Sequence, residues 1–207
     1  MRFGFLVFDD LEELDLLGPW ELIGVWADQD GGPSERLLIG KHTRGIRCAK
    51  GLYLTPDIAL DAVGRLDALL VPGGQGSRPA ARDPQILEFV RAHAARAPVL
   101  SVCTGALILA AAGLLDGRRA TTHFASLERL AGNDGIHVVE QRYVRDGDIW
   151  TSAGISAGMD MTLAYIAAMA GVDAAGRVQR WAEYYPDGVR HGDPAIHADM
   201  PAYVQQR

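Results

Sequence analysis

The sequence is poor in cysteine, and its two cysteines form no framework. Cys48 and Cys103 stand alone among 207 residues, which excludes a disulfide-stapled scaffold and fits a reducing compartment. Neither the cysteines nor the six histidines show the paired spacing of a zinc knuckle or of H-E-x-x-H. We therefore expect no metal site and no cofactor.

Long apolar runs and dense positive charge are also missing. No apolar stretch reaches the roughly 18 residues of a membrane span, and the chain enters strand-like sequence at residue 2 without the features of a signal peptide. Twenty Lys and Arg stand against 26 Asp and Glu, a net charge of −6, and the only dense basic run is Gly117–Arg119. We expect a cytoplasmic protein with neither a membrane nor a nucleic-acid partner.

What the sequence does have is a hydrophobic content of 48% in short apolar segments, enough for a substantial core. Apolar strands alternating with helices predict a parallel sheet covered on both faces, hence an α/β fold and one domain spanning residues 1–207. The expected strands lie at 3–8, 36–39, 46–54, 67–71, 99–102, 138–144 and 149–152. The expected helices lie at 19–26, 84–95, 106–112, 123–130, 157–169 and 174–184. Residues 9–18 read as an acidic loop, and a polar tail from about 186 is expected to lie over the surface.

The stretch from Ala97 to Gly113 is the most informative of the chain. A short apolar run behind Pro98 predicts a buried strand, and an Ala/Leu/Ile-rich run predicts a helix that stops at Gly113. Cys103 lies at the sharp turn between them, as in a nucleophile elbow. The free N–H groups at the start of the helix are expected to favour the thiolate. The alternative is that Cys103 is simply a small buried hydrophobe.

Two further strand ends carry unusual residues. Asp15 follows the first strand, and Gly73-Gly74 follow another, while Cys103 follows a third. Sites in open parallel sheets form at the carboxyl ends of the strands, so these residues can converge. The segment Pro72–Gly76 lacks the lysine of a P-loop and the spacing of a dinucleotide-binding loop.

Six blocks in order along the chain resemble the DJ-1/PfpI superfamily, and most of all the bacterial isonitrile hydratases within it. The blocks are Phe-Leu-Val-Phe-Asp-Asp (5–10), Leu-Asp-Leu-Leu-Gly-Pro (14–19), Leu-Val-Pro-Gly-Gly (70–74), Ser-Val-Cys-Thr-Gly-Ala (101–106), Ala-Thr-Thr-His (120–123) and Ser-Ala-Gly-Ile-Ser-Ala-Gly-Met-Asp (152–160). The resemblance implies a flavodoxin-like three-layer sandwich, a homodimer and a nucleophilic Cys103. It places an aspartate, Asp15, beside the cysteine. Thr104 stands where the peptidase-like members carry histidine, which argues against proteolysis.

The implied reaction is the hydration of a small-molecule isonitrile to an N-formamide through a covalent thioimidate on Cys103. Asp15 is expected to act as general acid and base, provided that burial raises its pKa; otherwise it caps a helix. Thr104 is expected to orient substrate or water, or to cap the following helix. The backbone N–H groups of Gly74 and Thr104 are the candidate donor pair beside the sulfur.

The remaining pocket candidates are Gly73 and three residues that the resemblance adds. His123 matches the family's histidine after Thr-Thr, with either a direct or a structural role. Ile155 and Ser156 match a segment that lines the pocket. Two other functions stay open: glyoxalase-type chemistry, which favours glutamate at position 15, and a non-catalytic ligand-sensing or oxidation-sensing domain, since exposed thiolates oxidise readily.

Overall fold

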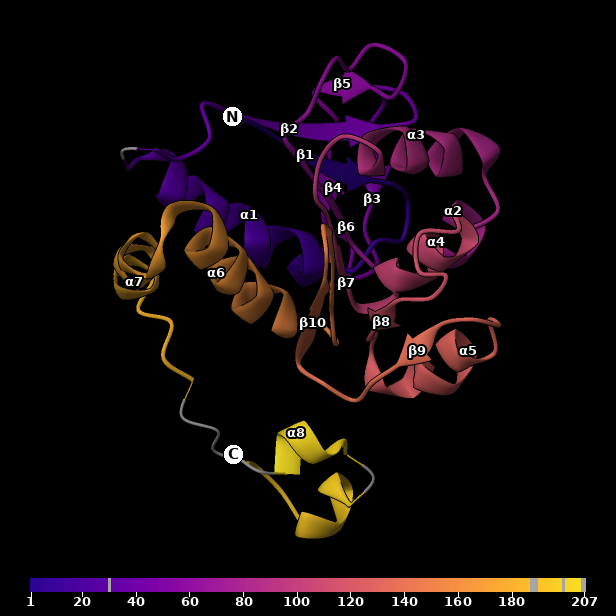
Figure 1. Ribbon diagram of the computed structural model, residues 1–207, viewed down its shortest axis with the longest axis vertical. Coiled ribbons are helices and arrows are strands. Elements are labelled where there is room, and N and C mark those ends of the chain that lie inside the picture. The colour runs from indigo at the N-terminus through magenta and orange to yellow at the C-terminus, as the bar shows by residue number, and fades with distance from the viewer. Residues whose placement is uncertain (30, 187–189, 199, 206–207) are drawn as a thin grey trace.

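A seven-stranded sheet forms the centre of the structure, a computed structural model that describes residues 1–29, 31–186, 190–198 and 200–205 (Figure 1). The strand order is β10–β11–β7–β6–β1–β2–β5. The strands are β1 (Arg2–Val7), β2 (Glu35–Gly40), β5 (Ile58–Ala59), β6 (Ala68–Val71), β7 (Val99–Val102), β10 (Tyr143–Asp146) and β11 (Ile149–Ser152). Within this sheet the pairing of β10 with β11 is antiparallel and the other five pairings are parallel. The predicted mostly parallel α/β sheet is confirmed.

Helices cover both faces of the sheet, as Figure 1 shows, so the sandwich has three layers. On one face lie α1 (Glu13–Ala27), α6 (Ala157–Ala170) and α7 (Val172–Trp181). On the other lie α2 (Ser77–Ala80), α3 (Pro84–Ala94), α4 (Ala106–Ala111) and α5 (Leu127–Ala131). Strands β6 and β7 are buried along their whole length between these layers, which explains why Ser101 is the one polar residue in the two strands.

Short elements complete the described chain. The region 46–54, predicted as a strand, is a hairpin of β3 (Ile46–Arg47) and β4 (Tyr53–Leu54), and Gly51 in the turn between them has φ +99°. A second small sheet pairs β8 (Arg119–Ala120) with β9 (His137–Val138). The 3-10 turns are η1 (Cys103–Gly105), η2 (Phe124–Ser126) and η3 (Pro194–His197).

The first helix begins earlier than the sequence suggested. We expected an acidic loop over 9–18 and a helix opening at Pro19, but α1 begins at Glu13 and contains Pro19 in its interior. The buried positions Asp15, Leu16, Pro19, Leu22, Ile23 and Trp26 follow helical spacing upstream of the proline as well as downstream of it. Burial of this continuous face outweighs the backbone hydrogen bond that proline cannot make. As a result Asp15 lies on the buried face of a helix.

The C-terminal tail, which we expected to lie over the surface, contains two short helical elements. It forms η3 and a short helix, α8 (Ala202–Gln205), both of which lie apart from the helical layers in Figure 1. Residues 187–189, 199 and 206–207 of the predicted tail lie outside the described residues. Within the described chain, every helix is too short or too polar to cross a membrane.

The order of the strands determines where the site forms. Strands β11, β7, β6 and β1 are neighbours in the sheet and run parallel, so their carboxyl ends open side by side. The loops at these ends begin at Ala153, Cys103, Pro72 and Phe8. These four loops bring together most of the residues singled out in the sequence.

Candidate active site

Cys103 lies at a strained turn between β7 and η1. Its φ is +56°, a left-handed conformation that a non-glycine residue adopts at a cost of about 1–3 kcal/mol. The turn fits only because Gly105 has no side chain: a Cβ there would collide with the carbonyl oxygen of Val71 and lie 2.9 Å from that of Pro72. The Thr122 hydroxyl donates a 2.7 Å hydrogen bond to the Cys103 carbonyl and holds the turn from the side. The sharp turn predicted between strand and helix at Cys103 is therefore present.

The thiol of Cys103 is almost completely buried, with 5% of the residue exposed. Burial is the main cause that raises its pKa, to about 12, and the neighbouring Asp15 adds to the rise. Hydrogen bonds from the backbone of Thr104 and Ile155, and from the Thr104 hydroxyl, lower the pKa by less. The expectation of a thiolate favoured by the helix N-terminus is therefore wrong for the free protein, because desolvation outweighs the nearby N–H groups.

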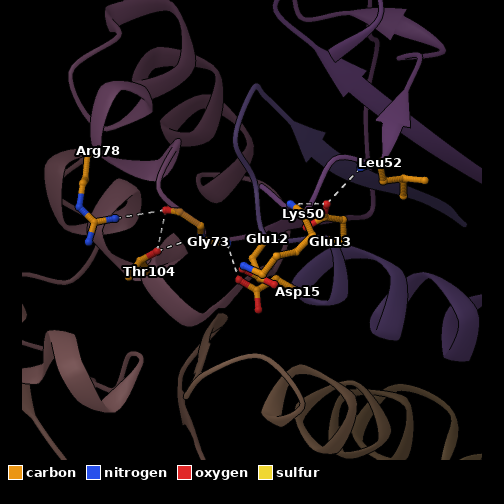
Figure 2. Close-up of polar contacts among 9 residues, drawn as sticks. Glu12, Glu13, Asp15, Lys50, Leu52, Gly73, Arg78 and Thr104 are labelled. Carbon is orange, nitrogen blue, oxygen red and sulfur yellow. Dashed lines mark hydrogen bonds and ion pairs between the residues drawn. The ribbon is translucent and has the colours of Figure 1, made fainter. Parts of the chain in front are cut away.

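Asp15 approaches the cysteine from the first turn of α1. The residue is fully buried, and Oδ2 accepts a 3.0 Å hydrogen bond from the N–H of Gly73, as Figure 2 shows. Oδ1 has no hydrogen-bond partner in the described chain. Burial raises the pKa of Asp15 to about 8, and the charge of Glu12 adds to the rise, whereas Gly73 and Cys103 lower it. At neutral pH Asp15 is therefore mainly a carboxylic acid.

Thr104 anchors the loop after β6 to the elbow. Its hydroxyl accepts hydrogen bonds from the Gly74 N–H at 3.0 Å and the Ser77 hydroxyl at 2.9 Å, and lies 3.1 Å from the Gly74 carbonyl. The Gly74 N–H is thus engaged by Thr104 and is not a free donor beside the sulfur, in contrast to our expectation. The backbone donors at the sulfur are those of Thr104 and Ile155. Gly73 is also crowded, since a Cβ there would lie 2.9 Å from Asp15 Oδ2.

His123 and the segment after β11 complete the site. His123 Nδ1 accepts a 3.2 Å hydrogen bond from the Ala125 N–H, which caps η2, and burial lowers its pKa. Ile155 has φ +46° and turns its backbone toward the sulfur. Ser156 lies farther out, where its hydroxyl accepts a 3.1 Å hydrogen bond from Arg142.

A cavity of about 250 Å³ opens above the sulfur. Cys103, Thr104, Gly74, His123 and Ile155 line it, as the sequence suggested, whereas Asp15, Gly73 and Ser156 do not. The lining also includes Glu12, Ala49, Lys50, Gln75, Arg78, Ala125 and Ser126. Of these, Lys50 and Arg78 were not anticipated, because Lys50 comes from the β3–β4 hairpin and Arg78 from α2, neither of which carries a recognisable motif.

Comparison with known proteins decides the family. A model of the DJ-1/PfpI family matches residues 1–168. The chain belongs to the DJ-1/PfpI family. It is 41% identical to the isonitrile hydratase of Pseudomonas putida over 187 residues. These residues cover 90% of this chain and 79% of that protein. It also resembles the crystal structure of a THiJ/PfpI family protein from Pseudomonas syringae, with a TM-score of 0.82 and 34% identity over 90% of this chain and 76% of that one.

A second relative, a glyoxalase, has a lower identity to this chain. A glutathione-independent glyoxalase from Caenorhabditis elegans is 24% identical over 166 residues, which cover 79% of this chain and 85% of that protein.

No group of three or more His, Cys, Asp and Glu side chains that could hold a metal ion is found in the described part of this DJ-1/PfpI chain. Cys48 is buried away from the cavity, and burial raises its pKa to about 11.

Proposed function

We propose that this protein hydrates isonitriles to N-formamides, with Cys103 as nucleophile and Asp15 as general acid and base. The observation that carries the proposal is a buried carboxylic acid placed against a cysteine at the floor of a small cavity. The identity of 41% to an isonitrile hydratase supports the reaction type. From the family resemblance the proposal also takes a cytoplasmic homodimer that needs no cofactor.

An isonitrile, R–N≡C, carries a lone pair on its terminal carbon, and this carbon must gain both a proton and a nucleophile. Asp15 in its acid form donates its proton to the carbon, which makes the carbon electrophilic. The sulfur of Cys103 then attacks, and the thiol proton returns to the Asp15 carboxylate. The sum is addition of S–H across one carbon, which gives the thioimidate R–N=CH–S–Cys103 with no atom lost.

Water completes the reaction in the second half. It adds to the thioimidate carbon while Asp15 takes the water proton and delivers a proton to nitrogen, so that R–NH–CH(OH)–S–Cys103 forms. Collapse of this intermediate transfers the hydroxyl proton to the departing sulfur and releases R–NH–CHO. General acid–base assistance of this kind is typically worth about 10²–10⁴ in rate.

The other residues position these two groups. The backbone donors of Thr104 and Ile155 stabilise negative charge as it develops on the sulfur during attack and departure. Gly73 fixes one carboxyl oxygen of Asp15 through its N–H, and the other, Oδ1, has no hydrogen-bond partner in the described chain. His123 is assigned a structural role in shaping the wall, because its Nδ1 is occupied by the cap of η2.

The test is formamide production from n-butyl isonitrile and phenyl isonitrile by the wild type and by Cys103→Ala. We expect turnover by the wild type and none by the variant. Cys48→Ala is the matched control and is expected to keep its activity, because Cys48 lies outside the cavity. Failure of the folded, reduced wild type to hydrate either compound, with turnover of methylglyoxal instead, would replace this proposal with the glyoxalase alternative.

A further inference from the structure

The charges that line the cavity are unequal. Three acidic or basic residues other than histidine line the cavity: Glu12, Lys50 and Arg78. Lys50 Nζ lies 2.8 Å from Glu12 Oε2, so these two charges offset each other at one edge of the cavity. Figure 2 shows this pair on the side of α1, and Arg78 on the opposite side of the loop that carries Gly73.

Arg78 has no such compensation. Its recorded side-chain hydrogen bond is a long one, 3.4 Å from Nη1 to the carbonyl oxygen of Gly74. In the described part of the chain no carboxylate forms an ion pair with it. A guanidinium has five N–H donors in a planar fork, so most of this group remains available to a ligand. The residue is half-buried, which limits how far water screens its charge.

The other titratable groups of the site do not balance this charge. Asp15 is mainly uncharged at neutral pH because burial raises its pKa. His123 is also neutral there, since burial lowers its pKa and Nδ1 already accepts a hydrogen bond. A cavity that is otherwise neutral therefore has one uncompensated cation, Arg78, in the wall that also contains Cys103.

Arg78 is placed to bind the part of a substrate that lies away from the reacting carbon. Its Nη1 and the Thr104 hydroxyl meet the same Gly74 carbonyl, so the guanidinium lies two hydrogen bonds from the residue that follows Cys103. The paired Glu12 and Lys50 at the other edge carry no net charge. The two edges together give the cavity a polarity that a neutral isonitrile would not use.

We propose that the substrate is an isonitrile that carries a carboxylate a few bonds from the isonitrile nitrogen, and that Arg78 binds this carboxylate. The proposal rests on the hydration reaction proposed above and specifies its substrate class. Arg78 forms a bidentate pair with the carboxylate, as planar guanidinium and carboxylate groups do. The isonitrile carbon then lies at the sulfur of Cys103, which the Asp15 carboxyl group contacts. A cavity of about 250 Å³ suits a small acid rather than a long-chain one.

The test compares isocyanoacetate with methyl isocyanoacetate, which has the same isonitrile group but no charge. For the wild type we expect kcat/KM to be higher for the acid. In Arg78→Met we expect the acid-to-ester ratio of kcat/KM to fall about 10- to 100-fold, mainly through KM for the acid, as is typical for loss of a charge-assisted pair. Arg78→Lys should restore part of the ratio, since it returns the charge without the planar fork.

Arg82→Met is the matched control, because Arg82 is exposed, follows α2 closely and does not line the cavity. It should leave the acid-to-ester ratio unchanged. Hydration of the ester and of n-butyl isonitrile without preference for the acid, or a ratio that Arg78→Met leaves unaltered, would overturn the carboxylate assignment alone. No hydration of any of the three isonitriles would overturn the proposed function and this assignment with it.

Discussion

The carboxyl group of Asp15 lies against the thiol of Cys103, and burial raises the pKa of both groups. Each therefore holds its proton at neutral pH, an unusual arrangement for a cysteine nucleophile, which is normally prepared as a thiolate. It suits a substrate whose reacting carbon must accept a proton as well as a sulfur. The pair can deliver both from its resting state, without a separate base.

Alkylation of Cys103 should be slow and should depend steeply on pH. Because the thiol pKa is raised to about 12, the rate with iodoacetamide should keep rising across pH 6–10 with no plateau. Asp15→Asn removes a group that raises this pKa, so its rate at pH 9 should exceed that of the wild type. Mass spectrometry of the Cys103 peptide measures both rates. A plateau near neutral pH in the wild type would mean that the thiolate forms readily.

Turnover should follow the protonation of Asp15. The acid form is required, and burial raises its pKa to about 8. We expect kcat/KM for a neutral isonitrile to be level below this pH and to fall about tenfold per unit above it. Initial rates of n-butyl isonitrile hydration between pH 5 and 10 measure the profile. A rate that rises through pH 8 instead would assign the essential form to the carboxylate.

Asp15 should also make the protein less stable as the pH rises. Its pKa is about 8 in the folded chain against 3.8 for the free group, so the folded state binds more protons between these values and loses stability across that window. Asp15→Asn should match the wild type near pH 4 and become more stable by a few kcal/mol near pH 8. Urea unfolding at several pH values gives the difference. Asp116→Asn, at an exposed position, controls for the loss of one carboxylate. If the free energy of unfolding depends on pH equally in Asp15→Asn and in the wild type, protonation of Asp15 is not linked to stability.

Gly105→Ala should damage the elbow. The new Cβ would meet the carbonyl oxygen of Val71 and lie close to Pro72, so we expect a loss of about 1–3 kcal/mol in the free energy of unfolding. Gly176→Ala is the control, since nothing lies within 4 Å of a Cβ there and alanine favours the exposed interior of α7 by about 0.5–1 kcal/mol. Thermal unfolding of both variants is the measurement. A Gly105→Ala variant as stable as the wild type would mean that the turn can relax.

The sequence was sufficient to predict the framework of the site. Two short apolar runs, one before Gly73 and one before Cys103, marked the ends of two strands. Parallel strands place such ends at one edge of the sheet. Asp15 was identified through its motif although its helix was predicted to begin too late. The error arose because proline was taken as a start signal, whereas the buried face of α1 continues upstream of it.

The electrostatics of the site could not be read from the sequence in the same way. The pKa of Cys103 depends on how completely the fold removes water from the sulfur, which is a property of packing rather than of neighbouring residues in the chain. Lys50 and Arg78 reach the cavity through long-range contacts. The hairpin that carries Lys50 is held against α1 by a 2.6 Å hydrogen bond, which the backbone N–H of Lys50 donates to Glu13 Oε1.

The account as a whole depends on a covalent bond between Cys103 and the isonitrile carbon. The most direct measurement is intact-protein and peptide mass spectrometry after rapid acid quench of the wild type with excess n-butyl isonitrile. We expect an adduct on Cys103 that adds the full mass of the isonitrile, because S–H adds across the carbon with no atom lost, and no adduct in Cys103→Ala. Formamide production with no mass increase on Cys103 at any quench time, and undiminished in Cys103→Ala, would contradict it.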